Sequence, residues 1–187
     1  MVDKLVIGLA GMAGSGKSLV VNVAKENGFN IIIMGDEVRE EARRRNIEPT
    51  PENLGEIMLE LRQKEGEAVI AKRCILKMER AAKQKIIVDG IRSLAEVEHF
   101  KQHFLNFTLV AVHASPETRF KRLFKRKRSD DPKSWEIFKE RDHRELGVGL
   151  GNAIAMAEYI IINEEEIDTA KGKAREMLRR IEENWMK

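Results

Sequence analysis

One glycine-rich octapeptide constrains the fold of this chain more than any other stretch. It consists of Gly11, Met12, Ala13, Gly14, Ser15, Gly16, Lys17 and Ser18. An apolar run, residues 5–10, comes directly before it, and a helical pattern over residues 19–24 follows. Strand, glycine loop and helix in this order form the context in which backbone N–H groups cradle a phosphate. The octapeptide therefore predicts an α/β fold with a phosphate-binding loop, or P-loop.

The residue types of this loop match the chemistry of nucleoside-triphosphate binding. Glycines let consecutive N–H groups turn inward, and the helix that follows directs its positive dipole end at the phosphates. Lys17 can reach the β- and γ-phosphates in a catalytic role, and the Ser18 hydroxyl can ligate Mg²⁺. The sequence predicts ATP and Mg²⁺ as cofactors, with residues 11–18 as the ATP site, and leaves open a preference for ATP over GTP.

The bulk properties favour one cytoplasmic domain. A chain of 187 residues suits a single core, so residues 1–187 are expected to form one domain. The single cysteine, Cys74, excludes an internal disulfide and is expected to be a packed thiol in a reducing compartment. We find no signal peptide and no apolar run long enough to span a bilayer. No membrane association is expected, and either a monomer or a homodimer is compatible with the sequence.

Five short apolar runs predict the sheet. They are rich in β-branched residues and do not alternate with polar ones, as in strands covered by helices on both faces. Helical patterns separate them, which indicates a five-stranded parallel sheet of the P-loop NTPase type. The runs are residues 5–10, 31–34, 85–89, 107–113 and 159–163.

A helical insertion, about residues 36–82, separates the second and third predicted strands. Asp36 is expected both to cap the first helix and to stand at the carboxyl edge of the sheet, where ligands bind in open parallel sheets. Thr50 and Pro51 predict the start of a further helix, which is continuous or kinked near Gly66. In a kinase this insertion would form the wall of the acceptor site, with Asp36 and Arg39 facing the acceptor.

The third predicted strand ends in an aspartate, as in the Walker B pattern. Asp89 is expected to hold Mg²⁺ directly or through water, together with Ser18. Arg92 lies just beyond the strand edge, within reach of an anionic ligand, and is predicted to act in catalysis and acceptor binding. Ser93 and Glu96 form the pattern of a capping box, which predicts a structural role for Ser93.

The most basic stretch follows the fourth predicted strand and indicates an arginine-rich lid, about residues 119–147. Arg119, Arg122 and Arg126 recur on one helix face, and a second helix carries Arg141. Arginine forks match phosphate oxygens, so Arg122, Arg126 and Arg141 are predicted to clamp the transferring phosphoryl group. Residues 147–151 contain three glycines but follow no strand, which favours a flexible connector or lid hinge over a second phosphate loop.

These motifs together resemble nucleoside monophosphate kinases over nearly the whole chain. Adenylate kinases carry Asp-Gly-Phe-Pro-Arg at the third strand, whereas this chain has Asp89-Gly90-Ile91-Arg92 without the proline. Residues 157–163 look like the Ala-Asp-x-Val-Ile-x-Asn signature of dephospho-coenzyme A kinases, and that likeness implies an acceptor-site carboxylate at Asp36. The chain is most similar to an uncharacterised family of small P-loop kinases, dephospho-coenzyme A kinase-like or adenylate kinase-related. Residues 129–135 and 140–142 look like its lid.

The sequence thus predicts an ATP-dependent phosphotransferase, a kinase that acts on a nucleotide or a nucleotide-like small metabolite such as a nucleoside monophosphate. One alternative is phosphorylation of a ribose hydroxyl, as in dephospho-coenzyme A kinases, for which Asp36 would serve as the base. A second alternative is an ATP-dependent RNA-binding switch that uses the basic stretch 119–128. Acidic residues from Asp130 onward and the absence of an RNA-binding motif make nucleic acid an unlikely partner.

Overall fold

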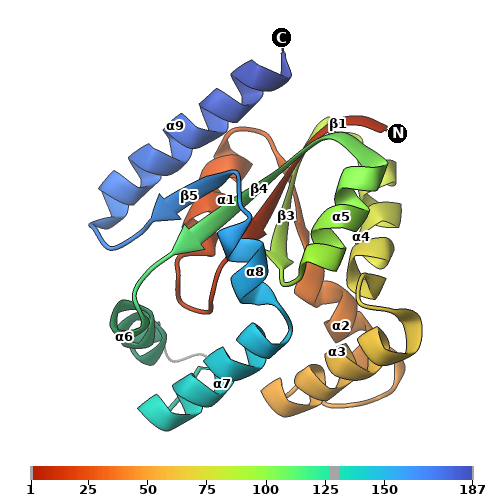
Figure 1. The fold of residues 1–187 in the computed structure, drawn as a ribbon, viewed down its shortest axis with the longest axis vertical. Coiled ribbons are helices and arrows are strands. Elements are labelled where there is room, and N and C mark those ends of the chain that lie inside the picture. The colour runs from red at the N-terminus through yellow and green to blue at the C-terminus, as the bar shows by residue number, and fades with distance from the viewer. Residues whose placement is uncertain (1, 127–130, 187) are drawn as a thin grey trace.

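The computed structural model describes residues 2–126 and 131–186. The described part of the chain contains one parallel sheet in the order β2-β3-β1-β4-β5, with β1 at its centre (Figure 1). This confirms the predicted five-stranded parallel sheet. The strands are β1 (Val2–Ala10), β2 (Asn30–Ile33), β3 (Lys85–Ile91), β4 (Phe104–His113) and β5 (Tyr159–Ile162).

Helices cover both faces of the sheet, as the apolar strands predicted. Alternate residues of β1 point into two separate cores: Leu5, Ile7 and Leu9 into one, Val6 and Ala10 into the other. The first core lies under α1 (Lys17–Glu26) and α9 (Ile167–Trp185). The second core receives side chains from the remaining face, including α5 (Leu94–His103) and α8 (Leu150–Ala155).

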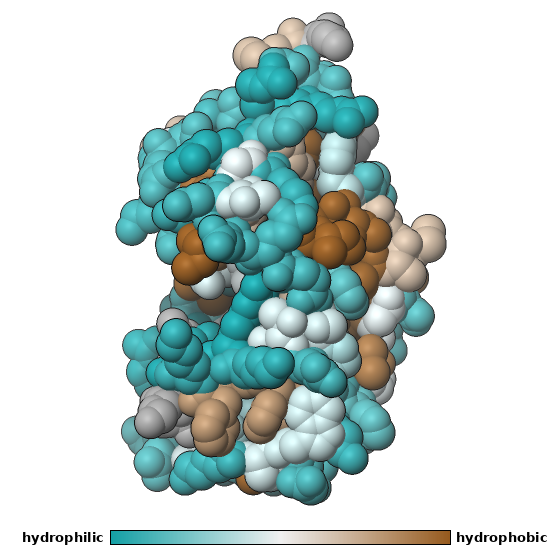
Figure 2. Space-filling model, turned by 90° about the vertical axis from the view of Figure 1, so that its left-hand side faces the viewer, coloured by the Kyte–Doolittle hydropathy of each residue, from teal (hydrophilic) through white to brown (hydrophobic). Residues whose placement is uncertain are grey.

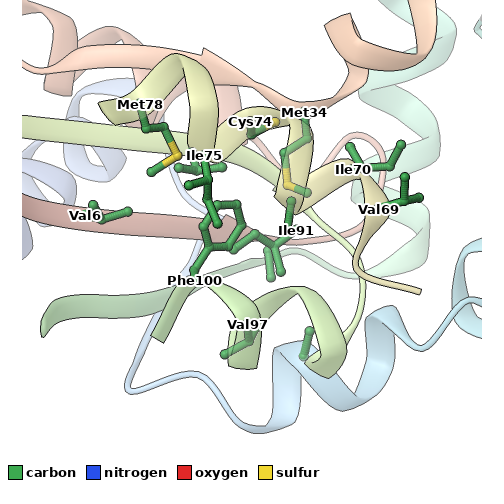
Figure 3. Packing of buried hydrophobic residues seen from close by; sticks show 14 of the residues in the cluster. Val6, Met34, Val69, Ile70, Cys74, Ile75, Met78, Ile91, Val97 and Phe100 are labelled. Carbon is green, nitrogen blue, oxygen red and sulfur yellow. The ribbon is translucent and has the colours of Figure 1, made fainter. Parts of the chain in front are cut away.

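The second core is built from branched aliphatic, methionine and phenylalanine side chains (Figure 3). Cys74 is fully buried within it, which confirms the predicted packed thiol. Burial raises the pKa of the Cys74 thiol far above its ordinary value, because the thiolate would be poorly solvated there. The cysteine is therefore a packing residue in this fold.

Three helices follow β2 and form the predicted insertion: α2 (Met34–Arg44), α3 (Pro51–Glu65) and α4 (Val69–Arg80). The Thr50 hydroxyl accepts a hydrogen bond from the Asn53 N–H and caps α3, as expected. Gly66, with φ of 94°, ends α3, so α3 and α4 are separate helices. The expected capping by Asp36 is wrong. Because α2 begins directly after β2, Ile33 is the N-cap and Asp36 lies inside the first turn.

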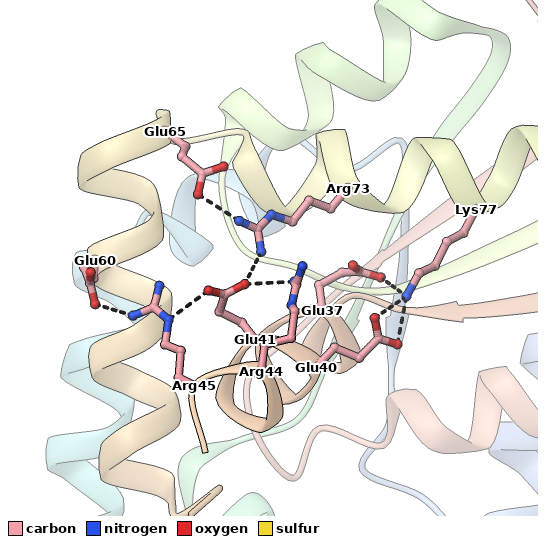
Figure 4. A network of polar contacts seen from close by, with 9 residues as sticks. All are labelled: Glu37, Glu40, Glu41, Arg44, Arg45, Glu60, Glu65, Arg73 and Lys77. Atoms are coloured by element: carbon pink, nitrogen blue, oxygen red, sulfur yellow. Dashed lines mark hydrogen bonds and ion pairs between the residues drawn. The ribbon is translucent and has the colours of Figure 1, made fainter. Parts of the chain in front are cut away.

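Ion pairs between polar faces hold the three insertion helices together (Figure 4). Glu41 of α2 accepts from Arg45 at 2.8 Å and from Arg73 of α4 at 2.9 Å. Arg45 also donates to Glu60 of α3 at 2.6 Å. These arginines lower the pKa of the Glu41 carboxyl, which keeps it ionised. The insertion is thus tied together by charge on its outer side and by apolar packing on its inner side.

The region predicted as a lid contains helices α6 (Pro116–Arg126) and α7 (Trp135–Gly147). Residues 127–130, which include Ser129 and Asp130 of the predicted lid, lie outside the described residues. Gly147 is the last residue of α7 and Gly151 lies within α8, so a turn of only Val148 and Gly149 separates the two helices. Gly149 is the left-handed N-cap of α8, and Leu150 is buried. The turn fixes the path from α7 back to the sheet.

Strand β5 forms one edge of the sheet and exposes Ile160 and Ile162, each about half accessible. Figure 2 shows brown hydrophobic surface amid teal on this side of the molecule. In the part of the chain that the structure describes, no helix is both long and apolar enough to cross a membrane.

Candidate active site

The glycine loop lies between β1 and α1, at the carboxyl edge of the central strand. Gly14 and Gly16 have φ values of +80° and +99°, which side-chain-bearing residues rarely adopt. A Cβ atom on Gly14 would lie 2.7 Å from the Arg119 carbonyl oxygen, and one on Gly16 would lie 2.0 Å from Asn163 Nδ2. The loop is therefore a close-fitting cradle between α6 and the end of β5, and only glycine fits at these two positions.

Lys17 is the first residue of α1 and turns back over the loop. Its ammonium group donates to the carbonyl oxygens of Gly11 at 2.5 Å and Met12 at 3.3 Å. Burial lowers the pKa of Lys17, and the nearby Arg92 and Arg141 act in the same direction, while Asp89 and Glu145 oppose them. Two arginines and two carboxylates from distant parts of the chain thus lie near enough to this lysine to influence its charge.

Asp89 lies on β3 next to Leu9 of β1, at the same sheet edge as the loop. Its pKa is raised by burial, against the attraction of Lys17 and Arg92. Within residues 2–126 and 131–186, its Oδ1 atom is buried and has no hydrogen-bond partner. Mg²⁺ prefers oxygen ligands. The Asp89 carboxylate and the exposed Ser18 hydroxyl, at the start of α1, are oxygen ligands of this kind beside the glycine cradle. The residues present therefore suit a magnesium–nucleotide complex.

Arg92 follows β3 and forms two ion contacts with α7. Its Nε donates to Glu145 Oε2 at 2.7 Å and its Nη2 to Glu145 Oε1 at 3.3 Å. The Arg92 backbone N–H donates to Glu96 Oε2 at 2.7 Å, and Arg62 of α3 donates to Glu96 Oε1 at 2.6 Å. Ser93 caps α5 through the Glu96 N–H as predicted. The Glu96 carboxylate, however, is fully buried and joins the third strand to the insertion.

The predicted lid arginines lie in different environments. Arg122 approaches the loop, with contacts to the Ser15 carbonyl oxygen at 3.5 Å and to Asn163 Oδ1 at 3.4 Å. Arg126 lies at the end of α6 and binds Asp131 at 3.0 and 2.5 Å. Arg141, on α7, is close enough to Lys17 to influence its pKa. The structure therefore brings Arg122 and Arg141 to the loop, whereas Arg126 pairs with Asp131.

Arg119 is the most buried arginine of this face and belongs to the site, although its pattern predicted no separate role. Two nitrogens donate to Asp142 of α7 at 2.9 and 2.5 Å, and Nη1 also donates to the Ala13 carbonyl oxygen at 3.2 Å. Its guanidinium lies 4.8 Å from the centre of the Phe138 ring. Arg119 thus connects the glycine loop to α7.

Asp36 and Arg39 lie at the start of α2, and Met34 packs beside Gly90 of β3. Both Arg39 contacts, at 3.0 and 2.6 Å, fall on Asp36 Oδ1. Each side chain of this pair is nearly half exposed. The pair therefore stands at the start of the insertion, and neither residue is among the charged groups that shift the pKa of Lys17 most.

Sequence reasoning missed the acidic and amide partners of the site. Asn163 donates from Nδ2 to the Ser15 carbonyl oxygen at 2.8 Å and so supports the loop from the end of β5. Asp142 and Glu145 were part of a charged helix pattern with no assigned role. Their spacing of three residues, which places both on one helix face, was the available signal. The remaining missed partners are Arg62 and Glu96.

The parallel sheet and the glycine cradle define this chain as a P-loop NTPase-type protein. Residues 10–139 match the AAA domain family. The chain is 47% identical over 178 residues to a UPF0200 protein of Hyperthermus butylicus, with 95% of each chain covered. It is 44% identical over 185 residues to a UPF0200 protein of Methanocaldococcus jannaschii, which covers 98% of this chain and 93% of that one. The chain belongs to the UPF0200 family and carries the AAA domain.

Three solved structures share this fold but little sequence with the chain. TT1252 from Thermus thermophilus superposes with a TM-score of 0.63 at 15% identity, covering 96% of this chain and 98% of that one. A shikimate kinase from Bacteroides thetaiotaomicron superposes with a TM-score of 0.60 at 18% identity, covering 94% of this chain and 98% of that one. A gluconokinase from Sinorhizobium meliloti superposes with a TM-score of 0.56 at 16% identity, covering 98% of this chain and 97% of that one. At these identities the likeness establishes the fold, which is that of small P-loop kinases.

Proposed function

We propose that this protein is an ATP-dependent phosphotransferase that acts on a nucleotide or a nucleotide-like small metabolite. The observation that carries the proposal is the convergence of Lys17, Asp89, Arg92 and Arg141 beside the glycine cradle. Phosphoryl transfer needs little covalent work from the protein and depends on positioning and charge stabilisation. A half-buried group of cations at a phosphate-binding loop supplies both. Two of the structural neighbours are named as small-molecule kinases, which supports the same class.

Each group of residues has a defined role in this proposal. The amides of residues 11–18 and the Lys17 ammonium hold the triphosphate, and Ser18 and Asp89 would hold Mg²⁺. When bound, Mg²⁺ would neutralise charge on the phosphates. Arg122 and Arg141 stabilise the phosphoryl group from the lid side. Arg126, paired with Asp131, serves as a lid residue farther along α6.

The acceptor binds on the insertion side in this proposal, beside Asp36, Arg39 and Arg92. A nucleoside monophosphate offers its own phosphate oxygen and needs no base, so arginines would dominate its site. A ribose hydroxyl would benefit from a base. Both Arg39 contacts fall on Asp36 Oδ1, which leaves Oδ2 to accept a proton and favours keeping the hydroxyl acceptor as a second candidate. The likeness of residues 157–163 to dephospho-coenzyme A kinases supports it as well.

An ADP-release screen tests the proposal. The panel contains nucleoside monophosphates, nucleosides, dephospho-coenzyme A, shikimate and gluconate, each with MgATP. Acceptor-dependent ADP release is expected from the wild-type protein and should be lost in Lys17→Met, which controls for a contaminating kinase. An Asp36→Asn variant then separates the acceptors: a large loss of kcat supports a hydroxyl, and near-normal turnover supports a monophosphate. No MgATP binding and no ADP release across the panel would refute the proposed function.

A further inference from the structure

Helix α7 places two carboxylates, Asp142 and Glu145, one turn apart on the side that faces the site. Each binds an arginine from a different part of the chain. Asp142 pairs with Arg119 of α6, and Glu145 pairs with Arg92 at the end of β3. The two pairs share no residue. Both are buried or half-buried, which distinguishes them from ion pairs on the protein surface.

The two arginines lie on different sides of the site. Arg119 donates to the Ala13 carbonyl oxygen as well as to Asp142, so it is attached to the glycine loop. Arg92 is tied through its backbone to Glu96, which binds Arg62 of the insertion. Because Asp142 and Glu145 bind different arginines, α7 connects the loop side with the insertion side.

The contact with Glu145 fixes the direction of the Arg92 guanidinium. The carboxylate binds the edge formed by Nε and Nη2, and neither bond uses Nη1. The end of the guanidinium that carries Nη1 is therefore left to bind an anion. Burial raises the pKa of Glu145, but the attraction of Arg92, followed by that of Arg141 and Lys17, outweighs it and holds the pKa below its ordinary value. Glu145 is thus ionised and able to orient Arg92 at neutral pH.

We propose that Glu145 is a positioning residue that aims Arg92 at an anionic group, a phosphate or a carboxylate, on the acceptor. Asp142 has the corresponding role on the other side, where it holds α7 against the ATP-binding loop through Arg119. This inference rests on the proposed phosphotransferase function. It assigns Asp142 and Glu145 to different halves of the reaction, which a purely structural role would not do.

Three substitutions test this division: Glu145→Gln, Asp142→Asn and, as the matched control, Glu140→Gln, an exposed glutamate of the same helix. The first measurement is the NMR signal of the Arg92 Nε–H group in protein labelled with ¹⁵N-arginine, assigned by its loss in Arg92→Lys. The second is the dissociation constant of MgATP by calorimetry. The third is kcat for ADP release with the most active member of the acceptor panel. Unfolding midpoints show that each variant is folded, and Glu145→Asp replaces the first variant if it is not.

Glu145→Gln should move the Arg92 signal, leave MgATP affinity within about twofold and lower kcat at least tenfold. Asp142→Asn should weaken MgATP binding at least fivefold, and Glu140→Gln should leave all three measurements unchanged. The inference is overturned if the Arg92 signal does not move in Glu145→Gln. It is equally overturned if that variant keeps its kcat, or loses MgATP affinity as much as Asp142→Asn does.

Failure of the proposed function gives a different result. A wild-type protein that neither binds MgATP nor releases ADP with any acceptor refutes the phosphotransferase, and the positioning role falls with it. In that case the Arg92 signal still decides whether Glu145 binds Arg92. A wild-type protein that turns over, with Glu145→Gln equally active, refutes the positioning role alone.

Discussion

Replacing Glu96 with glutamine should strongly destabilise the fold, because this carboxylate is fully buried and both of its oxygens are in use. Oε1 accepts from Arg62 Nη2 at 2.6 Å, and Oε2 accepts from the Arg92 backbone N–H at 2.7 Å. A glutamine keeps one acceptor and turns the other into a donor. Either Arg62 or the Arg92 N–H would then face an N–H₂ group, and the buried guanidinium would lose its counter-charge.

The size of the loss follows from these contacts. A hydrogen bond to a charged group contributes about 1.5–3 kcal/mol. Breaking a buried ion pair by removing one partner costs about 3–5 kcal/mol. The two figures describe overlapping interactions, so we expect the free energy of unfolding to fall by about 3–5 kcal/mol in total. At roughly 2–4 °C per kcal/mol for a chain of this size, the melting temperature should fall by about 6–20 °C.

Denaturant unfolding at pH 7, followed by far-UV circular dichroism, measures this free energy. The matched control is Glu98→Gln, because Glu98 is exposed on the same helix, and its effect should stay within about 0.5 kcal/mol. A loss for Glu96→Gln that is no larger than the control's would refute the reasoning. It would mean that the Arg62 guanidinium does not need the Glu96 carboxylate as its counter-charge.

Three further results are expected. Gly16→Ala should lower the free energy of unfolding by about 1–3 kcal/mol and weaken MgATP binding in calorimetry. The reason is that φ of Gly16 is +99° and the new Cβ would lie 2.0 Å from Asn163 Nδ2. An unchanged MgATP affinity would contradict the cradle geometry. Burial raises the pKa of Asp89, so its ionisation costs stability as the pH rises through that pKa. Asp89→Asn should therefore gain stability relative to wild type as the pH rises from about 4 through the raised pKa of Asp89 in denaturant titrations, and a constant difference would count against a buried carboxylate. Cys74 should react with a thiol reagent only after unfolding, and fast labelling of the native protein would show that it is not packed.

Local patterns were sufficient to predict the strands and the glycine loop. The apolar runs are short, contiguous and separated by helices, so their burial could be inferred without knowledge of any partner. Thr50 and Ser93 could be predicted as caps because a cap bonds only three residues ahead. Asp36 was misplaced for the same reason: a cap depends on the exact start of a helix, and α2, with Ile33 as its N-cap, begins three residues earlier than a cap at Asp36 would place it.

The polar partners of the site could not be predicted, because the fold brings them together over long distances in the chain. Arg92 and Glu145 are 53 residues apart, and Asn163 and Ser15 are 148 apart. No periodicity relates such pairs. Arg119 illustrates the difficulty, since it shares a helix face with Arg122 and Arg126 but is the buried one. Which arginine of such a face turns inward depends on where Asp142 lies, and that is set by packing.

The pairing of arginines with carboxylates follows from the cost of burying charge. An arginine cannot lose its proton in a protein, so burying a guanidinium near the P-loop is costly unless a carboxylate accompanies it before any phosphate arrives. In this chain the counter-charges come from helices: Asp142 and Glu145 from α7, Glu96 from α5. In the proposed phosphotransferase, an arriving anion would meet guanidinium groups that are already oriented and partly desolvated, which would lower the cost of organising them during the reaction. The acidic residues of the site are thus as much a part of its anion-binding capacity as the arginines.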